Sequence, residues 1–289
     1  MLFVAAIASH LEGKVHVGLS SGLNPVTPEH FEAGIMHHVR NLSRDRAALF
    51  AKFGVPARFQ NWEYLSPHGT LVFSTPEYIR QPIPDGVTLV GPARSSFIRG
   101  DEVGFPWDQL PIDGTPILYV SFGSQINYQP ALFEKIIRVA SKLPVFTVLS
   151  AGPLAVRYQN QKNLLAVAYA PQRELLKRTS VFISHGGANS VMEALGEGVS
   201  LLVHPLSSDQ PLQARFLTEA EAGERIDLET MSDSDLANAI QRSLARVAVP
   251  RLAEITASYQ AADGVKTAAD FLEASLTGAE SRYDSEKLI

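Results

Sequence analysis

The sequence predicts an α/β protein of two domains, built on parallel sheets that helices cover on both faces. In the second half of the chain, short apolar runs alternate with segments of helical period, and glycines follow several of the runs. Strands that are buried on both faces have this appearance, and they are typical of parallel sheets. The length of 289 residues fits two domains of roughly 150 residues each.

The first half is predicted to form a partial domain over residues 1–98. Apolar periodicity and turn residues predict its elements. In chain order they are a helix at 1–11, a strand at 14–19, one or two helices between 24 and 53, and short buried strands at 70–73 and 87–91.

Residues 99–114 are rich in glycine and proline and show little periodicity, so they are predicted to link the domains. A second domain is expected over 115–276, followed by a polar, fraying tail at 277–289. Its predicted strands are 117–122, 145–149, 164–168, 181–183 and 201–203, and its helices lie at 132–140, after Gly187, from Asp209 and from Ser232. Sheets of this kind bind ligands at the carboxyl ends of their strands.

Composition excludes several classes of protein. The net charge of −5 argues against a nucleic-acid partner, which would need a basic patch. The chain has no cysteine, which excludes disulfides and cysteine-based nucleophiles or metal sites. The apolar start is short and has no basic segment, and no run is long enough to span a membrane. A cytoplasmic protein is therefore expected.

The strongest motif is Ser-His-Gly-Gly-Ala-Asn-Ser-Val-Met-Glu at residues 184–193, where a strand gives way to a helix. Its glycines allow close approach of a ligand, and the helix start offers free N–H groups. A phosphate could sit at Asn189 and Ser190, and Glu193, one turn deeper, could accept hydrogen bonds from vicinal hydroxyls. A tight turn with a capped helix is an equally open interpretation of this motif alone, and His185 alone would more often be structural.

Two further segments follow neighbouring predicted strands. Tyr169 could stack on a nucleobase, or it could be a core tyrosine preceding a helix that begins near Pro171. Asp209 and Gln210 could bind sugar hydroxyls, or they could only cap a helix. Since all three segments follow strands, their combination is much more specific than any one of them.

Together these segments resemble the donor-binding signature of the UDP-glycosyltransferases. The resemblance is specific over residues 169–210. The same alternation of strands and helices extends back to the strand before Ser124, and the resemblance is vague before residue 93. It implies two Rossmann-like domains that face each other across a cleft, the GT-B arrangement, with the N-terminal one partial. The implied nucleotide-binding residues are Tyr169 on the base, Ala170 (through its backbone) and Gln172 beside it, His185, Ser124, Gly187, Asn189 and Ser190 at the diphosphate, and Glu193 on the ribose. Asp209 and Gln210 would hold the sugar.

The resemblance implies inverting transfer of a sugar from a UDP- or dTDP-sugar to a hydroxyl of a lipophilic small molecule, without a metal or other cofactor. Tyr169 replaces the usual Trp or Phe, which leaves thymine open as the base. The family's general base is a histidine after a first strand, and it has no match in this chain. Five N-terminal histidines are interpreted as structural or surface residues; they are His10, His16, His30, His37 and His38.

An incomplete N-terminal sheet would expose an unpaired edge, so either a fragment of low stability or a partner chain or dimer that covers this edge is expected. Two other functions stay open. A non-catalytic nucleotide-sugar-binding subunit would keep the donor site and lack the base. A nucleotide-sugar epimerase would share the architecture but would need acid and base residues from both domains.

Overall fold

The computed structural model describes residues 3–28, 31, 34–56, 58–94, 99–124, 128–246 and 250–286; the side chains of 34–40 and 277–286 lie outside this description. The chain divides into two compact units. The first unit comprises residues 1–95 and 261–289, and the second unit comprises residues 96–260. The predicted linker, 99–114, therefore lies within the second unit, and residues 261–276 lie within the first.

The first unit contains a small parallel sheet of order β1-β4-β5, and a hairpin of β2 and β3, within its described residues. Its strands are β1 (Gly18–Ser20), β2 (Phe59–Gln60), β3 (Glu63–Tyr64), β4 (Thr70–Val72) and β5 (Val87–Leu89). Its helical segments are α1 (Phe3–Leu11), η1 (Asn24–Val26), α2 (Gly34–Lys52), α3 (Pro76–Ile79) and α10 (Gly264–Glu286).

An aromatic cluster ties α1 and α2 to the hairpin. The rings of Phe3, Phe50, Phe59 and Tyr64 lie 5.0–5.8 Å apart between centroids, mostly edge to face. Such pairs add stability beyond their buried area. The apolar residues that suggested a helix at the start of the chain thus have a local core of their own.

The strand expected at 14–19 is shorter than predicted and starts only at Gly18. The backbone of His16 forms hydrogen bonds with side chains and not with a neighbouring strand. Its N–H donates to Nδ1 of His68, and its carbonyl accepts a hydrogen bond from the Ser66 hydroxyl. Alternation of apolar residues could not reveal this competition, because both partners lie about fifty residues away.

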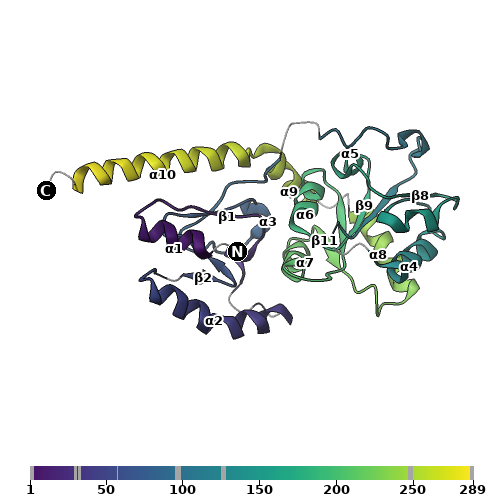
Figure 1. Ribbon diagram of the computed structural model, residues 1–289. Coiled ribbons are helices and arrows are strands. Elements are labelled where there is room, and N and C mark those ends of the chain that lie inside the picture. Colours follow the sequence, from purple (N-terminus) through teal and green to yellow (C-terminus); the bar gives the residue numbers. More distant parts are fainter. Residues whose placement is uncertain are drawn as a thin grey trace. The chain divides into compact units, whose positions relative to one another are not determined.

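The polar end of the chain does not fray at residue 277 as expected, because α10 continues to Glu286 (Figure 1). The helix packs on the small sheet through Ala268 and Phe271, which join Leu71 and Val90 in one cluster. A Cβ atom on Gly264 would lie 2.3 Å from the carbonyl oxygen of Gly91, so backbone meets backbone where α10 begins. This packing explains why the end of the chain belongs to the first unit.

The second unit is a parallel α/β sheet, as predicted. In the part of it that the structure describes, six strands run in the order β11-β10-β9-β6-β7-β8. These strands are β6 (Ile117–Ser121), β7 (Phe146–Ser150), β8 (Leu164–Val167), β9 (Val181–Ser184), β10 (Ser200–Val203) and β11 (Gly223–Arg225). The helical segments are η2 (Trp107–Gln109), α4 (Pro130–Ala140), η3 (Gly152–Tyr158), α5 (Gln172–Leu176), α6 (Ala188–Gly196), α7 (Gln210–Glu219), α8 (Asp233–Arg246) and α9 (Pro250–Ala261).

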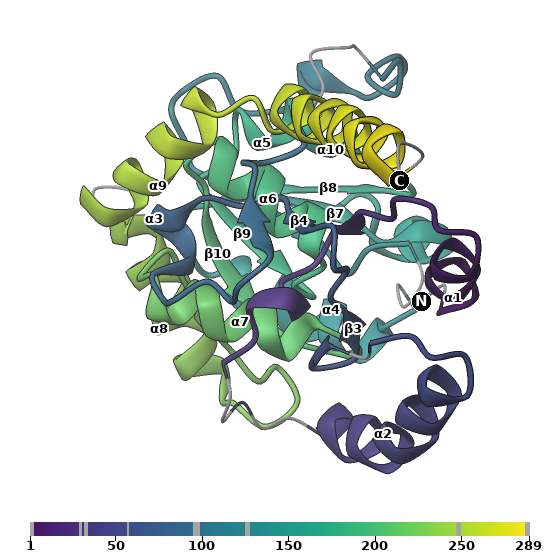
Figure 2. The same cartoon turned by 90° about the vertical axis from the view of Figure 1, so that its left-hand side faces the viewer.

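Helices cover both faces of this sheet: α6 and α7 lie on one face and α4 and α8 on the other (Figure 1, Figure 2). Strands β6, β9 and β10 are buried along their whole length. This burial on both faces accounts for the unbroken apolar runs in the sequence.

The strand order also places the ligand site. From β6 the chain moves outward to β7 and β8, and it then returns to the other side of β6 as β9 and β10. The connections therefore leave in opposite directions at the carboxyl ends of β6 and β9. In open α/β sheets the crevice at such a reversal is where ligands bind.

Candidate functional site

The turn between β9 and α6 forms the centre of the candidate site. Gly186 has a φ of 85°, in the left-handed region that favours glycine. A Cβ there would also lie 2.5 Å from Cγ1 of Val203, so only glycine fits. The turn delivers the His185 side chain and the first amides of α6 to the end of the sheet.

Glycines enclose the imidazole of His185. A Cβ on Gly123, after β6, would lie 2.8 Å from its Cε1 atom, and a Cβ on Gly187 would lie 2.6 Å from Nε2. Because β6 and β9 are adjacent strands, the two glycines hold the ring at the point where the chain direction reverses. Ser124 follows Gly123 and is exposed at the same edge.

Burial lowers the pKa of His185 below its ordinary value of 6.5. The ring is therefore neutral at pH 7 and can donate one hydrogen bond. Its Nδ1 atom is buried, and a backbone hydrogen bond with Ser121 partly opposes the shift. A neutral donor in this position suits an anionic ligand that brings its own charge.

The start of α6 adds further donors. Gly187 is the N-cap residue and supplies no side-chain hydrogen bond to the helix. The N–H groups of the first turn have no partner within a helix, and the helix dipole makes this end positive. Asn189 is exposed and Ser190 partly buried on this turn. The predicted diphosphate residues Ser124, His185, Gly187, Asn189 and Ser190 thus follow two adjacent strands.

Gln172, Ser190 and Glu193 meet although they come from two helices. Nε2 of Gln172 donates to Oε2 of Glu193 at 2.7 Å and lies 3.3 Å from the Ser190 hydroxyl. On its other side, the hydroxyl of buried Tyr119 lies 3.5 Å from Oε1 of Gln172. Burial raises the pKa of Tyr119, so this hydroxyl stays protonated. The network orients the Gln172 amide and, through it, the Glu193 carboxylate.

Tyr169 and Ala170 follow β8, as the sequence predicts. The Tyr169 side chain is 62% exposed, so its ring is accessible to a planar ligand. Its hydroxyl donates to Oδ2 of Asp101 at 2.7 Å, and this bond, followed by burial, raises the pKa of Tyr169. Ala170 is buried as a whole residue, backbone included.

Asp209 and Gln210 differ in how far their side chains are available to bind a ligand. Oε1 of Gln210 accepts the N–H groups of Leu206 and Ser207 at 2.7 and 2.8 Å, and the side chain is 7% exposed. Gln210 therefore braces the loop between β10 and α7. Asp209 makes no capping bond to α7, although its side chain hydrogen-bonds that of Gln213, and desolvation raises its pKa. Of the two predicted sugar ligands, Asp209 is the freer one in this structure.

Sequence reasoning missed Arg99 and Asp101. Nη2 of Arg99 lies 2.7 Å from Oε1 of Glu193, and Asp101 holds the hydroxyl of Tyr169. The arginine is 94 positions from its partner, within a stretch interpreted only as a linker. Neither residue stands in a local motif, so no sequence signal could have identified them.

The family described as UDP-glucoronosyl and UDP-glucosyl transferase matches residues 114–248. That range contains all the predicted site residues, from Ser124 to Gln210. Residues 114–248 belong to the UDP-glycosyltransferase family. The predicted resemblance is confirmed.

Curated relatives are longer than this chain. YojK of Bacillus subtilis, an uncharacterized UDP-glucosyltransferase, is 34% identical over 207 residues, which cover 70% of this chain and 50% of the relative. The demethyllactenocin mycarosyltransferase of Streptomyces fradiae is 27% identical over 181 residues, covering 59% of this chain and 38% of that protein. The chain thus spans about half the length of these relatives or less.

Solved structures confirm the fold class. A kitacinnamycin glycotransferase has a TM-score of 0.76 at 23% identity, over 94% of this chain and 73% of its own. The calicheamicin glycosyltransferase CalG4 has a TM-score of 0.73 at 22% identity, over 95% and 73%. At this identity the likeness concerns the α/β fold with parallel sheets and not the substrates.

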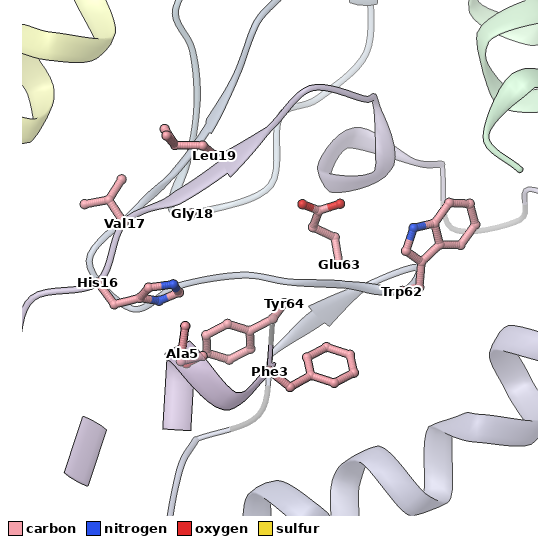
Figure 3. A pocket seen from close by; sticks show the side chains of 10 residues that line it. Phe3, Ala5, His16, Val17, Gly18, Leu19, Trp62, Glu63 and Tyr64 are labelled. Carbon is pink, nitrogen blue, oxygen red and sulfur yellow. The ribbon is translucent and has the colours of Figure 1, made fainter. Parts of the chain in front are cut away.

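The first unit has a cavity of about 440 Å³ beside β1 (Figure 3). Aromatic side chains line it, among them Phe3, Trp62 and Tyr64, together with the carboxylate of Glu63. Oε2 of Glu63 accepts a hydrogen bond from Asn24 at 3.3 Å. The lining suits an apolar or aromatic molecule that carries a hydrogen-bond donor.

The histidines of the first unit occupy different environments. His16 lines the cavity and stacks on Tyr64, with ring centroids 6.0 Å apart. Burial, and then the neighbouring His68, lower its pKa. His10 is exposed on α1. His30 lies outside the described residues, as do the side chains of His37 and His38.

The described residues hold no cluster of three or more His, Cys, Asp or Glu side chains that could bind a metal ion. Over the same part of the chain, no helix has the length and apolar character of a membrane span.

Proposed function

We propose that the protein transfers a sugar from a UDP- or dTDP-sugar to a hydroxyl group of a lipophilic small molecule, with inversion and without a metal ion. The donor would bind at the carboxyl ends of β6, β8, β9 and β10. One observation carries this proposal: His185 lies at the turn that leads into the uncapped start of α6, and Glu193 lies in the same helix, about one turn beyond Asn189 and Ser190. That spacing supports a diphosphate at the helix start and a ribose diol at Glu193.

The diphosphate is the leaving group of such a transfer. Hydrogen-bond donors that are already in place stabilise charge as it develops on a leaving group. The imidazole of His185, the hydroxyl of Ser190 and the first amides of α6 are such donors. They would take over the part that a metal ion plays in other nucleotide-sugar enzymes.

Tyr169 would stack on the base, with Gln172 and the backbone of Ala170 at its edge. The exposure of the Tyr169 ring and the position of Gln172 beside Glu193 support this assignment. Asp209 would bind sugar hydroxyls, and Gln210 would hold the loop that presents it. The acceptor would bind to the first unit, where the cavity beside β1 offers apolar walls.

Calorimetric titration with UDP, dTDP and their sugars tests the donor site. Glu193→Ala should weaken binding of the preferred nucleotide by about 1.5–3 kcal/mol, or tenfold or more, because a hydrogen-bonded charge is lost. Glu224→Ala is the matched control, since Glu224 is also partly exposed and paired with an arginine, Arg242, at 2.7 Å. Equal nucleotide binding by a folded Glu193→Ala protein and the parent would reject the assignment.

A further inference from the structure

A short segment before β6 reaches the candidate nucleoside site at two points. The guanidinium of Arg99 lies 2.7 Å from Oε1 of Glu193. Two residues further on, Asp101 accepts a hydrogen bond of 2.7 Å from the Tyr169 hydroxyl. Both contacts fall within the second unit, on the residues proposed to hold the ribose and the base.

In this arrangement both carboxylate oxygens of Glu193 have partners. Arg99 occupies Oε1, and Gln172 occupies Oε2 at 2.7 Å. The Glu193 side chain is only 13% exposed, whereas that of Arg99 is 48% exposed. The arginine therefore lies on the open side of the carboxylate, which is the side that a ribose would approach.

The second contact holds the segment in place. The Tyr169 ring is accessible, but its hydroxyl is tied to Asp101. Only Gly100 separates Arg99 from Asp101, so the two contacts lie within three consecutive residues. Release of the Tyr169 hydroxyl should therefore loosen Arg99 as well.

We propose that Arg99 and Asp101 form a latch over the nucleoside site, and that the ribose of an incoming nucleotide replaces Arg99 on Glu193. This proposal rests on the proposed function, because it assumes that Glu193 binds the ribose. The latch makes Arg99 and Asp101 determinants of nucleoside affinity from outside the donor motif.

The strength of the latch can be bounded. An ion pair with an exposed partner contributes little free energy to the contact that it makes, and salt weakens it further. Its loss should tighten nucleoside binding by about two- to fivefold. This effect is small enough for a nucleotide to overcome and large enough to measure.

Uridine is the decisive probe because it is neutral, whereas the charge of Arg99 would also attract the phosphates of UDP. In calorimetric titrations, Arg99→Gln should bind uridine more tightly than the parent, by about two- to fivefold. Arg157→Gln is the matched control: it removes the same charge from an exposed pair with Glu134 in the same unit. It should leave uridine affinity unchanged.

Two further results are expected. Raising salt from about 0.05 M to about 0.5 M should tighten uridine binding to the parent but not to Arg99→Gln, because screening weakens the ion pair. Tyr169→Phe, which keeps the ring and removes the hydroxyl, should tighten uridine binding in the parent and add nothing in Arg99→Gln.

Weaker uridine binding by Arg99→Gln would overturn the latch, since Arg99 would then be a ligand of the nucleoside. Unchanged affinity without a salt effect would also overturn it, while normal UDP binding would leave the donor site standing. Failure of the parent and of every variant to bind either uridine or UDP would reject both the donor site and the latch.

Discussion

The substitution Gly187→Ala should disable the diphosphate site through one contact. The backbone of Gly187 has a φ of −63° and a ψ of 138°, which alanine adopts without strain. The new Cβ would lie 2.6 Å from Nε2 and 3.0 Å from Cε1 of His185, and its three nearest atoms all belong to that ring. On the other side, the ring already fills the space that a Cβ on Gly123 would need, 2.8 Å from its Cε1 atom. It must therefore leave its position.

The size of the effect follows from what the ring would do. A hydrogen bond to a charged group contributes about 1.5–3 kcal/mol, so UDP should bind roughly ten- to 150-fold more weakly to Gly187→Ala. Uridine has no diphosphate and should bind as it does to the parent. The thermal midpoint should change little, since no backbone strain or cavity is introduced.

The assay is a double-mutant cycle in UDP affinity, with the parent, Gly187→Ala, His185→Ala and the double variant. If the methyl group acts by displacing the imidazole, it should cost nothing once the imidazole is gone. The double variant should then match His185→Ala, a strongly non-additive result. Additive losses, or parental UDP affinity in Gly187→Ala, would refute the reasoning.

Three further outcomes are expected. EDTA should leave UDP binding intact, and abolition of binding that Mn²⁺ then restores would contradict the proposed metal independence. The 289-residue chain should turn over UDP-sugars poorly, because a positioned general base accelerates such a reaction by about 10²–10⁴-fold and no residue here matches the family's base. Robust transfer to a broad acceptor panel would contradict this expectation, and His16, in the cavity, would then be the first residue to substitute. Because burial lowers the pKa of His16 and His185 below 6.5, the unfolded chain binds more protons in acid, and the free energy of unfolding should fall as the pH drops below about 6.5. Denaturant titrations should show a smaller decline for His185→Gln, and an equal decline would mean that its burial does not matter.

Much of the second unit could be predicted from the sequence. Residues 181–183 and 201–203 are apolar runs, and glycines at 186 and 187 end the first of them. Such patterns reflect burial and backbone freedom, which act within a few residues. They therefore indicate a parallel sheet and a helix start suited to phosphate before any contact is known.

Local patterns were less informative in the first unit. The hairpin of β2 and β3 has only two residues in each strand, with Asn61 in the left-handed region at its turn. Strands of two residues are too short to show a periodic pattern of apolar side chains. The polar residues near the end of α10 suggested fraying, but the helix is anchored further back, at Phe271 beside Gly69.

The sequence by itself determined the alternation of strands and helices, the glycine turns and the identity of the donor motif. Only the tertiary structure decided which strand ends meet, that the His185 ring lies between Gly123 and Gly187, and that Gln210 braces its own loop. It also brought Arg99 to Glu193 across 94 positions. The physical reason is range: propensity and periodicity act between neighbours in the chain, whereas the contacts that shape this site depend on strand order and side-chain packing, which no local pattern encodes.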